Sequence, residues 1–115
     1  MLNLHFALGS PPARACLMLI RNLDLDVQVI NVNLAGGEQH GDEFTKLNPL
    51  HKVPVLVDDD FVLSESRAIM AYLVSAKKPG SSMYPSEPKA RAKVDQRLYY
   101  DATVVFASAA NFVVG

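Results

Sequence analysis

The sequence has little of several features, and each scarcity excludes a class of protein. It contains one cysteine, Cys16, so no intramolecular disulfide framework can form, and this suits a reducing compartment. The 11 Lys and Arg residues against 12 Asp and Glu residues give a formal net charge of -1, without a long basic run. We therefore expect neither nucleic acid nor an anionic membrane as a partner. The His, Cys and carboxylate side chains show no metal-ligand spacing, so we predict no metal.

Long apolar runs are also missing. The longest, residues 102–115, is interrupted by Ser108 and Asn111 and is too short to span a bilayer. Residues 1–6 lack the basic start and the long apolar core of a signal peptide. What remains is an ordinary globular composition, 50% hydrophobic and 20% charged, in a chain of 115 residues. We expect a soluble, cytoplasmic protein.

Periodicity predicts a βαβ unit in the first third of the chain. Residues 2–6 alternate apolar and polar side chains, as in a strand. A loop rich in glycine and proline ends at residue 12, and apolar residues then recur at helical spacing up to residue 23. Residues 27–32 form a second predicted strand. Strand, helix and strand at this spacing indicate two parallel strands.

The next segments predict a helix, a hairpin and another helix. A glycine-rich loop at residues 35–41 precedes a short helix at residues 42–47. Residues 53–57 and 61–63 flank three aspartates and predict a hairpin, with Pro54 at the start of its strand. A helix then opens at Ser64-Glu65-Ser66, and its expected apolar face consists of Ile69, Tyr72, Leu73 and Ala76. The order β-α-β, α, β-β-α is that of an α/β, thioredoxin-like domain.

A segment rich in turn residues divides the chain after this domain. A longer helix is expected to follow, with an apolar face formed by Leu98, Ala102, Val105, Ala109 and Phe112. Such a stripe needs a partner, either more chain or another subunit. We therefore expect a thioredoxin-like domain at residues 1–78, a linker at 79–85, and at 86–115 the first helix of an all-α C-terminal domain that is truncated here.

Three segments of this plan are expected to converge on one pocket. Thioredoxins carry Cys-x-x-Cys where this chain reads Ser10-Pro11-Pro12-Ala13, so disulfide exchange is not expected. The Ser10 hydroxyl can still donate to an anion at this helix end. A cis Pro54 would expose the Val53 backbone to an extended peptide. The helix start at Glu65 offers N–H groups for a carboxylate, and its side chain offers a counter-charge for an ammonium. Together these predict a site for a short peptide with a free amino group and carboxylates.

Four stretches, in this order and spacing, carry a specific resemblance that covers essentially the whole chain: Ser10-Pro11-Pro12-Ala13-Arg14, residues 48–58, residues 63–69 and residues 96–101. Through them the chain resembles an insect-type cytosolic glutathione transferase of the delta class or the closely related epsilon class. The resemblance implies that Ser10 stabilises the glutathione thiolate. It also implies that Val53, before Pro54, pairs with the cysteinyl backbone, and that the γ-glutamyl end is held by Glu65 and Ser66, with Arg67 nearby.

The resemblance also implies contacts at the other end of glutathione. His51 would lie at the glycine end. This chain has Gln39, with His40 beside it, where the family often has a second histidine. A hydrophobic pocket for the second substrate would be bordered by Pro12, Leu34 and Phe106.

The implied activity is transfer of the glutathione thiolate to hydrophobic electrophiles, as in detoxification, by a homodimer that needs no cofactor besides glutathione as co-substrate. A free thiol with a pKa of about 8.5 is mostly protonated at neutral pH, and lowering that pKa by about two units requires roughly 2.7 kcal/mol. The Ser10 hydroxyl and the helix dipole can supply energy of this order. Two alternatives remain open: a non-catalytic glutathione-binding or protein-interaction module, and peroxidase activity at the same site. Cys16 and His5 are expected to be structural.

Overall fold

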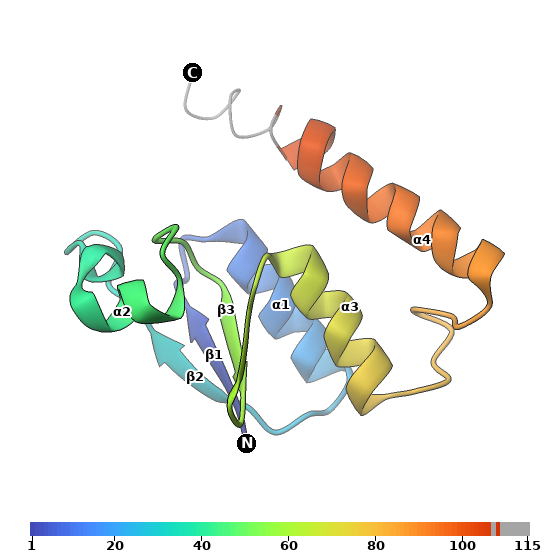
Figure 1. Cartoon of the computed structure of the whole chain (residues 1–115), viewed down its shortest axis with the longest axis horizontal. Coiled ribbons are helices and arrows are strands. Elements are labelled where there is room, and N and C mark those ends of the chain that lie inside the picture. Colours follow the sequence, from blue (N-terminus) through green and yellow to red (C-terminus); the bar gives the residue numbers. More distant parts are fainter. Residues whose placement is uncertain (107, 109–115) are drawn as a thin grey trace. The chain divides into compact units, whose positions relative to one another are not determined.

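The computed structural model describes residues 1–106 and 108 of the 115-residue chain (Figure 1). The chain divides into two compact units, Met1–Leu73 and Val74–Gly115. The elements in chain order are β1 (Leu2–Phe6), α1 (Pro11–Asn22), β2 (Gln28–Asn31), the 3-10 turn η1 (Glu38–His40), α2 (Asp42–Leu47), β3 (Val55–Asp58), β4 (Phe61–Ser64), α3 (Ser66–Lys77), α4 (Pro88–Tyr100) and the π-helical segment η2 (Asp101–Val105).

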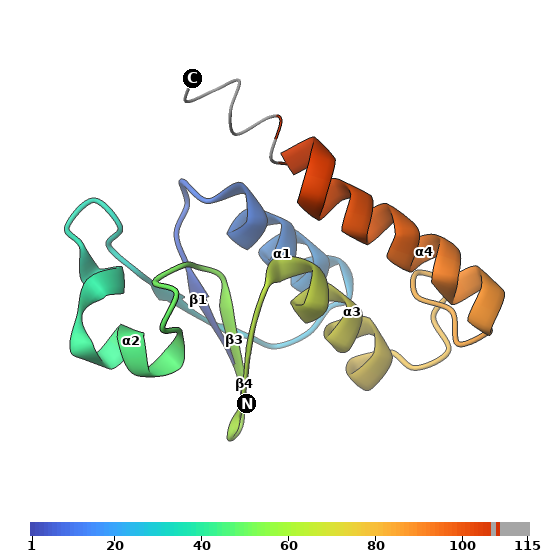
Figure 2. The same ribbon diagram turned by 45° about the horizontal axis from the view of Figure 1, so that its top comes forward.

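A four-stranded mixed sheet organises the first unit. The strand order is β2-β1-β3-β4, with β1 parallel to β2 and antiparallel to β3, and with β3 antiparallel to β4. Figures 1 and 2 show α1 and α3 side by side on one face of this sheet and α2 on the other side. The predicted βαβ unit, the hairpin and the thioredoxin-like α/β fold are confirmed.

The core is built on the central strands β1 and β3, because helices cover both faces of these strands. Leu4 on β1 and both Val55 and Leu56 on β3 are fully buried. On the α2 side, Phe44 packs with Val32 and Val55 in one cluster. On the α1 and α3 side, Cys16, Ile20, Ile69 and Leu73 are buried, as their helical spacing predicts, and Ala13 is buried as well.

The structure corrects several predicted boundaries. β2 lacks both of the outer valines in the predicted range 27–32, although the N–H of Val32 still donates to Phe6 at 2.8 Å. β3 begins at Val55 rather than at residue 53, because Pro54 has no N–H to give to the ladder. The predicted apolar face of α3 is wrong at Ala76, which is exposed.

The second unit contains the predicted longer helix. α4 begins at Pro88, where the side chain of Glu87 accepts hydrogen bonds from the next two N–H groups of the helix, at 3.1 and 2.7 Å. The helix continues as the π-helical segment η2, which the sequence does not predict. On its expected apolar face, Leu98 and Ala102 are half-buried and Val105 is exposed, whereas Ala109 and Phe112 lie outside the described residues.

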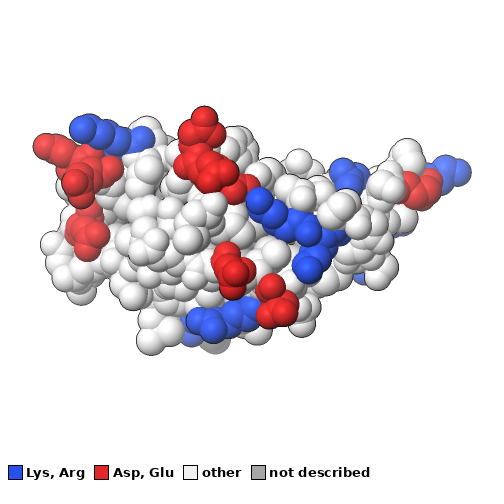
Figure 3. Space-filling view, turned by 90° about the horizontal axis from the view of Figure 1, so that it is seen from below, with Lys and Arg blue, Asp and Glu red and all other residues white. Residues whose placement is uncertain are grey.

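Charge on the surface is mixed. On the face shown in Figure 3, acidic and basic side chains form small separate groups. No helix in the described part of the chain is both long enough and apolar enough to cross a membrane.

Candidate glutathione site

The strand register places the predicted site segments at one end of the sheet. His5 near the end of β1 pairs with Val55 at the start of β3, and Val55 pairs with Ser64 at the end of β4. The loop after β1, the loop before β3 and the turn after β4 therefore meet at the same end of the sheet, as Figures 1 and 2 show. Because β2 is parallel to β1, the loop that follows β2 starts from this end of the sheet too.

Ser10 is the N-cap of α1. Its Oγ accepts a hydrogen bond from the N–H of Ala13 at 3.2 Å, and its carbonyl accepts one from Arg14 at 3.0 Å. Pro11 and Pro12 occupy the first two helical positions and have no N–H, so no unpaired backbone N–H remains in the first turn of α1. The remaining donor at this helix start is the hydroxyl proton of Ser10, which the Ala13 contact does not use.

The Val53-Pro54 peptide bond is cis, as the sequence predicts. Pro54 is buried, and the half-buried side chain of Val53 packs against the cluster that contains Phe44. Within the described residues, no hydrogen bond uses the backbone N–H or C=O of Val53. Both groups therefore remain available to an extended peptide placed alongside them.

Asn48 organises the loop that leads to this peptide bond. It is only 5% exposed, its Nδ2 donates to the carbonyl of Lys52 at 2.9 Å, and its Oδ1 accepts from the N–H of Leu50 at 3.0 Å. Its own carbonyl accepts from the N–H of His51 at 3.0 Å. One buried amide thus fixes the backbone on both sides of His51, which has a positive φ of 61°.

The ring of His51 is held against the η1 turn. Its Nδ1 lies 2.9 Å from the carbonyl oxygen of Gln39, and the ring centroid lies 4.8 Å from that of His40. A carbonyl can only accept, so Nδ1 carries the proton and donates it, which leaves Nε2 for another partner. The side-chain Oε1 of Gln39 is buried and has no hydrogen-bond partner among the described residues. The Gln39 backbone thus supports His51 directly, and His40 packs on the ring.

The start of α3 combines an exposed carboxylate with a buried hydroxyl. Glu65, with φ 74°, lies just before the helix, and its carbonyl accepts from the N–H of Ile69 at 2.9 Å. Ser66 is 3% exposed, and its Oγ accepts a hydrogen bond from Arg67 Nη1 at 3.1 Å. The first N–H groups of α3 have no intrahelical acceptor, so this end is suited to an anion.

Cys16 reaches the same turn from α1. Its Sγ donates to the carbonyl of Ser66 at 3.7 Å, and its side chain is fully buried. Burial raises the pKa of the Cys16 thiol to about 12, against the opposing charge of Arg67. The thiol is therefore protonated at neutral pH and acts as a donor, which confirms the expected core position.

The three residues predicted to border the second-substrate pocket are divided between the two units. Pro12 is half-buried in the first turn of α1, and Leu34 is half-buried against the Val32 and Phe44 cluster. Phe106 is half-buried just after η2 in the second unit. The first unit therefore supplies two of the predicted residues, at the same end of the sheet as Ser10.

Sequence reasoning missed the supporting roles of Asn48, Cys16 and the Gln39 carbonyl. The signal for Asn48 was present, since a buried asparagine between a helix end and Pro49 commonly bonds to nearby backbone. The other two are contacts between segments 50 and 12 residues apart, which a single sequence does not reveal.

Comparison with known proteins agrees with this geometry. The family described as "Glutathione S-transferase, N-terminal domain" matches residues 2–75. "Glutathione S-transferase 1" from Manduca sexta is 52% identical over 99 residues, which are 85% of this chain and 46% of that protein.

Two solved structures are similar as well. A delta-class glutathione transferase from Nilaparvata lugens superposes with a TM-score of 0.91 at 41% identity, covering 96% of this chain and 52% of that one. A glutathione transferase homologue from Drosophila mojavensis, solved with bound glutathione, gives a TM-score of 0.88 at 43% identity, covering 92% of this chain and 48% of that one. The chain thus spans about half the length of these relatives. With the family match over its thioredoxin-like unit, the chain belongs to the glutathione S-transferase N-terminal domain family.

Proposed function

We propose that the chain is the glutathione-binding part of a glutathione S-transferase, which conjugates the thiolate of reduced glutathione to hydrophobic electrophiles. The observation that carries the proposal is the meeting of three segments at one end of the sheet: the Ser10 cap, the start of α3 at Ser66, and the Val53 backbone, which has no hydrogen-bond partner among the described residues. The relative from Drosophila mojavensis, solved with bound glutathione, supports the choice of ligand.

Each segment matches one part of the tripeptide. The carboxylate of the γ-glutamyl group would accept from Ser66 and from the first N–H groups of α3, with Glu65 facing the ammonium and Arg67 holding the Ser66 hydroxyl. The cysteinyl backbone would pair with Val53 before Pro54. These contacts fix the thiol near the start of α1.

The glycine end of glutathione would lie at the His51 loop. Nε2 of His51 would donate to the carboxylate, and because Nδ1 already donates to the Gln39 carbonyl, this contact requires a proton on both ring nitrogens. Gln39 and His40 shape this end through the backbone contact and the ring contact. We propose that the electrophile binds beside Pro12 and Leu34 of the first unit.

Ser10 would act as a hydrogen-bond donor to the thiolate, not as a nucleophile. Its Oγ already accepts from Ala13, so its proton is the group left to donate. A charge-assisted hydrogen bond of this kind contributes about 1.5–3 kcal/mol, which corresponds to roughly one to two units of thiol pKa. No other cofactor is required for this step.

We propose a delta-class or epsilon-class homodimer in the cytoplasm, with a glutathione-binding domain at residues 1–78, a linker at 79–85 and the beginning of a helical domain at 86–115. The delta-class relative at 41% identity supports the class, and the loop between α3 and α4 supports the linker.

The test is a titration of this chain with reduced glutathione, followed by thiolate absorbance, alongside Ser10→Ala, Ser10→Thr and Ser66→Ala. We expect the wild type and Ser10→Thr to form thiolate at neutral pH. Ser10→Ala should bind glutathione with a thiol pKa about one to two units higher. Ser66→Ala should weaken binding but leave the pKa of the bound thiol unchanged. The proposal is refuted if the wild type neither binds nor ionises glutathione, or if Ser10→Ala ionises it as well as the wild type does.

A further inference from the structure

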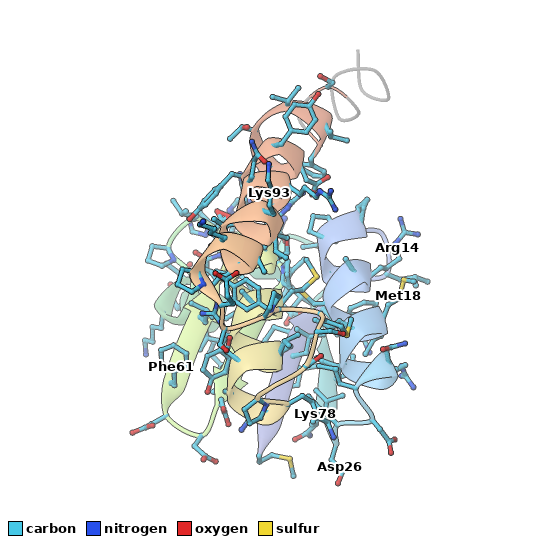
Figure 4. All side chains as sticks on the ribbon, turned by 90° about the vertical axis from the view of Figure 1, so that its right-hand side faces the viewer. Arg14, Met18, Asp26, Phe61, Lys78 and Lys93 are labelled. Carbon is cyan, nitrogen blue, oxygen red and sulfur yellow. The ribbon has the colours of Figure 1, made fainter. Side chains whose placement is uncertain are left out.

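α1 presents two different sides to its surroundings. Figure 4 shows Arg14 and Met18 pointing outward, and Met18 is 70% exposed. Cys16, two residues from each, lies on the opposite side of the helix and is fully buried. Figures 1 and 2 show that this helix runs beside α3. The thiol is thus placed between the two helices whose first turns form two parts of the proposed site.

The contact that the thiol makes is specific. Its Sγ lies 3.7 Å from the carbonyl oxygen of Ser66, the residue proposed to hold the γ-glutamyl carboxylate. A carbonyl oxygen has two lone pairs and can accept the thiol proton alongside a helical hydrogen bond. On its other side, the Oγ of Ser66 accepts from Arg67 at 3.1 Å. Ser66 is thereby held through its backbone from α1 and through its side chain from its own helix.

We propose that Cys16 is a positioning residue for glutathione: its thiol, by donating to the Ser66 carbonyl, fixes the orientation in which Ser66 presents its hydroxyl to the γ-glutamyl carboxylate. The inference rests on the proposed function, because it concerns the same ligand. Because Cys16 is fully buried, it would contact neither glutathione nor the reacting thiol and would act only through Ser66. Because burial keeps the thiol protonated, this donor is present throughout the neutral pH range.

Two substitutions separate positioning from packing. Cys16→Ala removes the donor and leaves a small gap in the core. Cys16→Ser restores a donor at nearly the same size, but places a hydroxyl in an apolar environment. If Cys16 only fills space, Cys16→Ser should bind glutathione no better than Cys16→Ala, since serine fits a buried apolar site less well. If Cys16 positions Ser66, Cys16→Ser should bind better than Cys16→Ala.

The measurement is the dissociation constant for reduced glutathione by titration calorimetry, with thermal unfolding recorded for every variant. We expect Cys16→Ala to bind about three- to fivefold more weakly than the wild type, the size expected for one weak sulfur-donated hydrogen bond. Cys16→Ser should return to within about twofold of the wild type. The control is Ile20→Val, a change one turn further along the same buried side of α1, which should leave the dissociation constant unchanged.

The outcomes are distinguishable. If the wild type does not bind glutathione, the proposed function fails and the inference fails with it. If the wild type binds and Cys16→Ala binds equally well, only the positioning role is overturned. Equal weakening in Cys16→Ala and Cys16→Ser, or weakening in Ile20→Val of the same size, also overturns it, because each result assigns the effect to packing.

Discussion

Replacement of Asn48 tests how the loop before the cis proline is held. Asn48→Ala removes both side-chain hydrogen bonds, to the Lys52 carbonyl and from the Leu50 N–H. Each such bond contributes about 0.5–1.5 kcal/mol, so we expect a loss of about 2 kcal/mol in the free energy of unfolding. For a domain of this size that corresponds to a decrease of roughly 10 °C in the unfolding midpoint. Because the same loop carries His51 and Val53, glutathione binding should weaken in parallel.

Asn48→Asp separates the two bonds. The introduced carboxyl can still accept from the Leu50 N–H, but when ionised it places a second acceptor against the Lys52 carbonyl in a site that is 5% exposed. Both burial and the facing carbonyl raise its pKa in the folded state above the unfolded value of about 3.9. The stabilising protonated form is therefore fully present below that unfolded pKa, and its contribution is lost as the pH rises through the folded pKa.

Urea unfolding at several pH values decides between these expectations. At neutral pH, Asn48→Asp should be at least as destabilised as Asn48→Ala, and it should become the more stable of the two as the pH falls towards about 4. The wild type, measured under the same conditions, corrects for the other titrating groups. If Asn48→Ala loses less than about 0.5 kcal/mol, or if the two variants keep the same order at every pH, the loop is not held by this amide.

Two further predictions concern the stability of the fold. Burial lowers the pKa of His5 below 6.5 in the folded state, so the unfolded chain binds this proton first and the folded state loses stability as the pH falls below 6.5. His5→Gln should remove this loss, which urea unfolding at several pH values measures. If the free energy of unfolding depends on pH as steeply in His5→Gln as in the wild type, the burial argument is contradicted. A Cβ added at Gly36 would lie 2.6 Å from Nδ2 of Asn33, whose Oδ1 accepts from the Gly36 N–H at 3.0 Å. Gly36→Ala should therefore cost about 1 kcal/mol in the wild type and almost nothing in an Asn33→Ala background, and equal costs in a double-mutant cycle would disprove the clash.

Most of the fold could be predicted because its signals are local. Strand alternation, helical spacing and turn residues can be recognised within a few residues of each element. The order of the elements then indicates the thioredoxin-like arrangement. The boundaries were less predictable. Val27 is apolar but lies outside β2, and Ala76 has helical spacing but is exposed, since packing of the folded chain decides which apolar residues are covered.

The residues of the proposed site could be predicted from the sequence, but the contacts that hold them in place could not. Each part lies at the end of an element, where capping and turn chemistry are visible, as for Ser10 and Pro54. The supports join distant segments: the Cys16 thiol to the Ser66 carbonyl, and the His51 ring to the η1 turn. Nothing in the local sequence around Cys16 distinguishes a hydrogen-bonding thiol from an ordinary core residue, so only the tertiary structure assigns this contact.

The hydrogen bonds already made at the site indicate which kind of ligand it can accept. The Oγ atoms of Ser10 and Ser66 both accept from the protein, so each hydroxyl has its proton left to donate. His51 uses Nδ1 on the η1 turn and has Nε2 left, and within the part of the chain that the structure describes the N–H and C=O of Val53 have no partner. These groups include two hydroxyl donors at helix starts, while one exposed carboxylate, that of Glu65, offers the opposite charge. A ligand that matches this set carries several anionic acceptors, an extended peptide backbone and one ammonium, and reduced glutathione in its thiolate form has all three. Under the proposed function the two serines are separable by experiment, because Ser10 would donate to the thiolate, whereas Ser66 would donate only to a carboxylate that is ionised whether or not the thiol is.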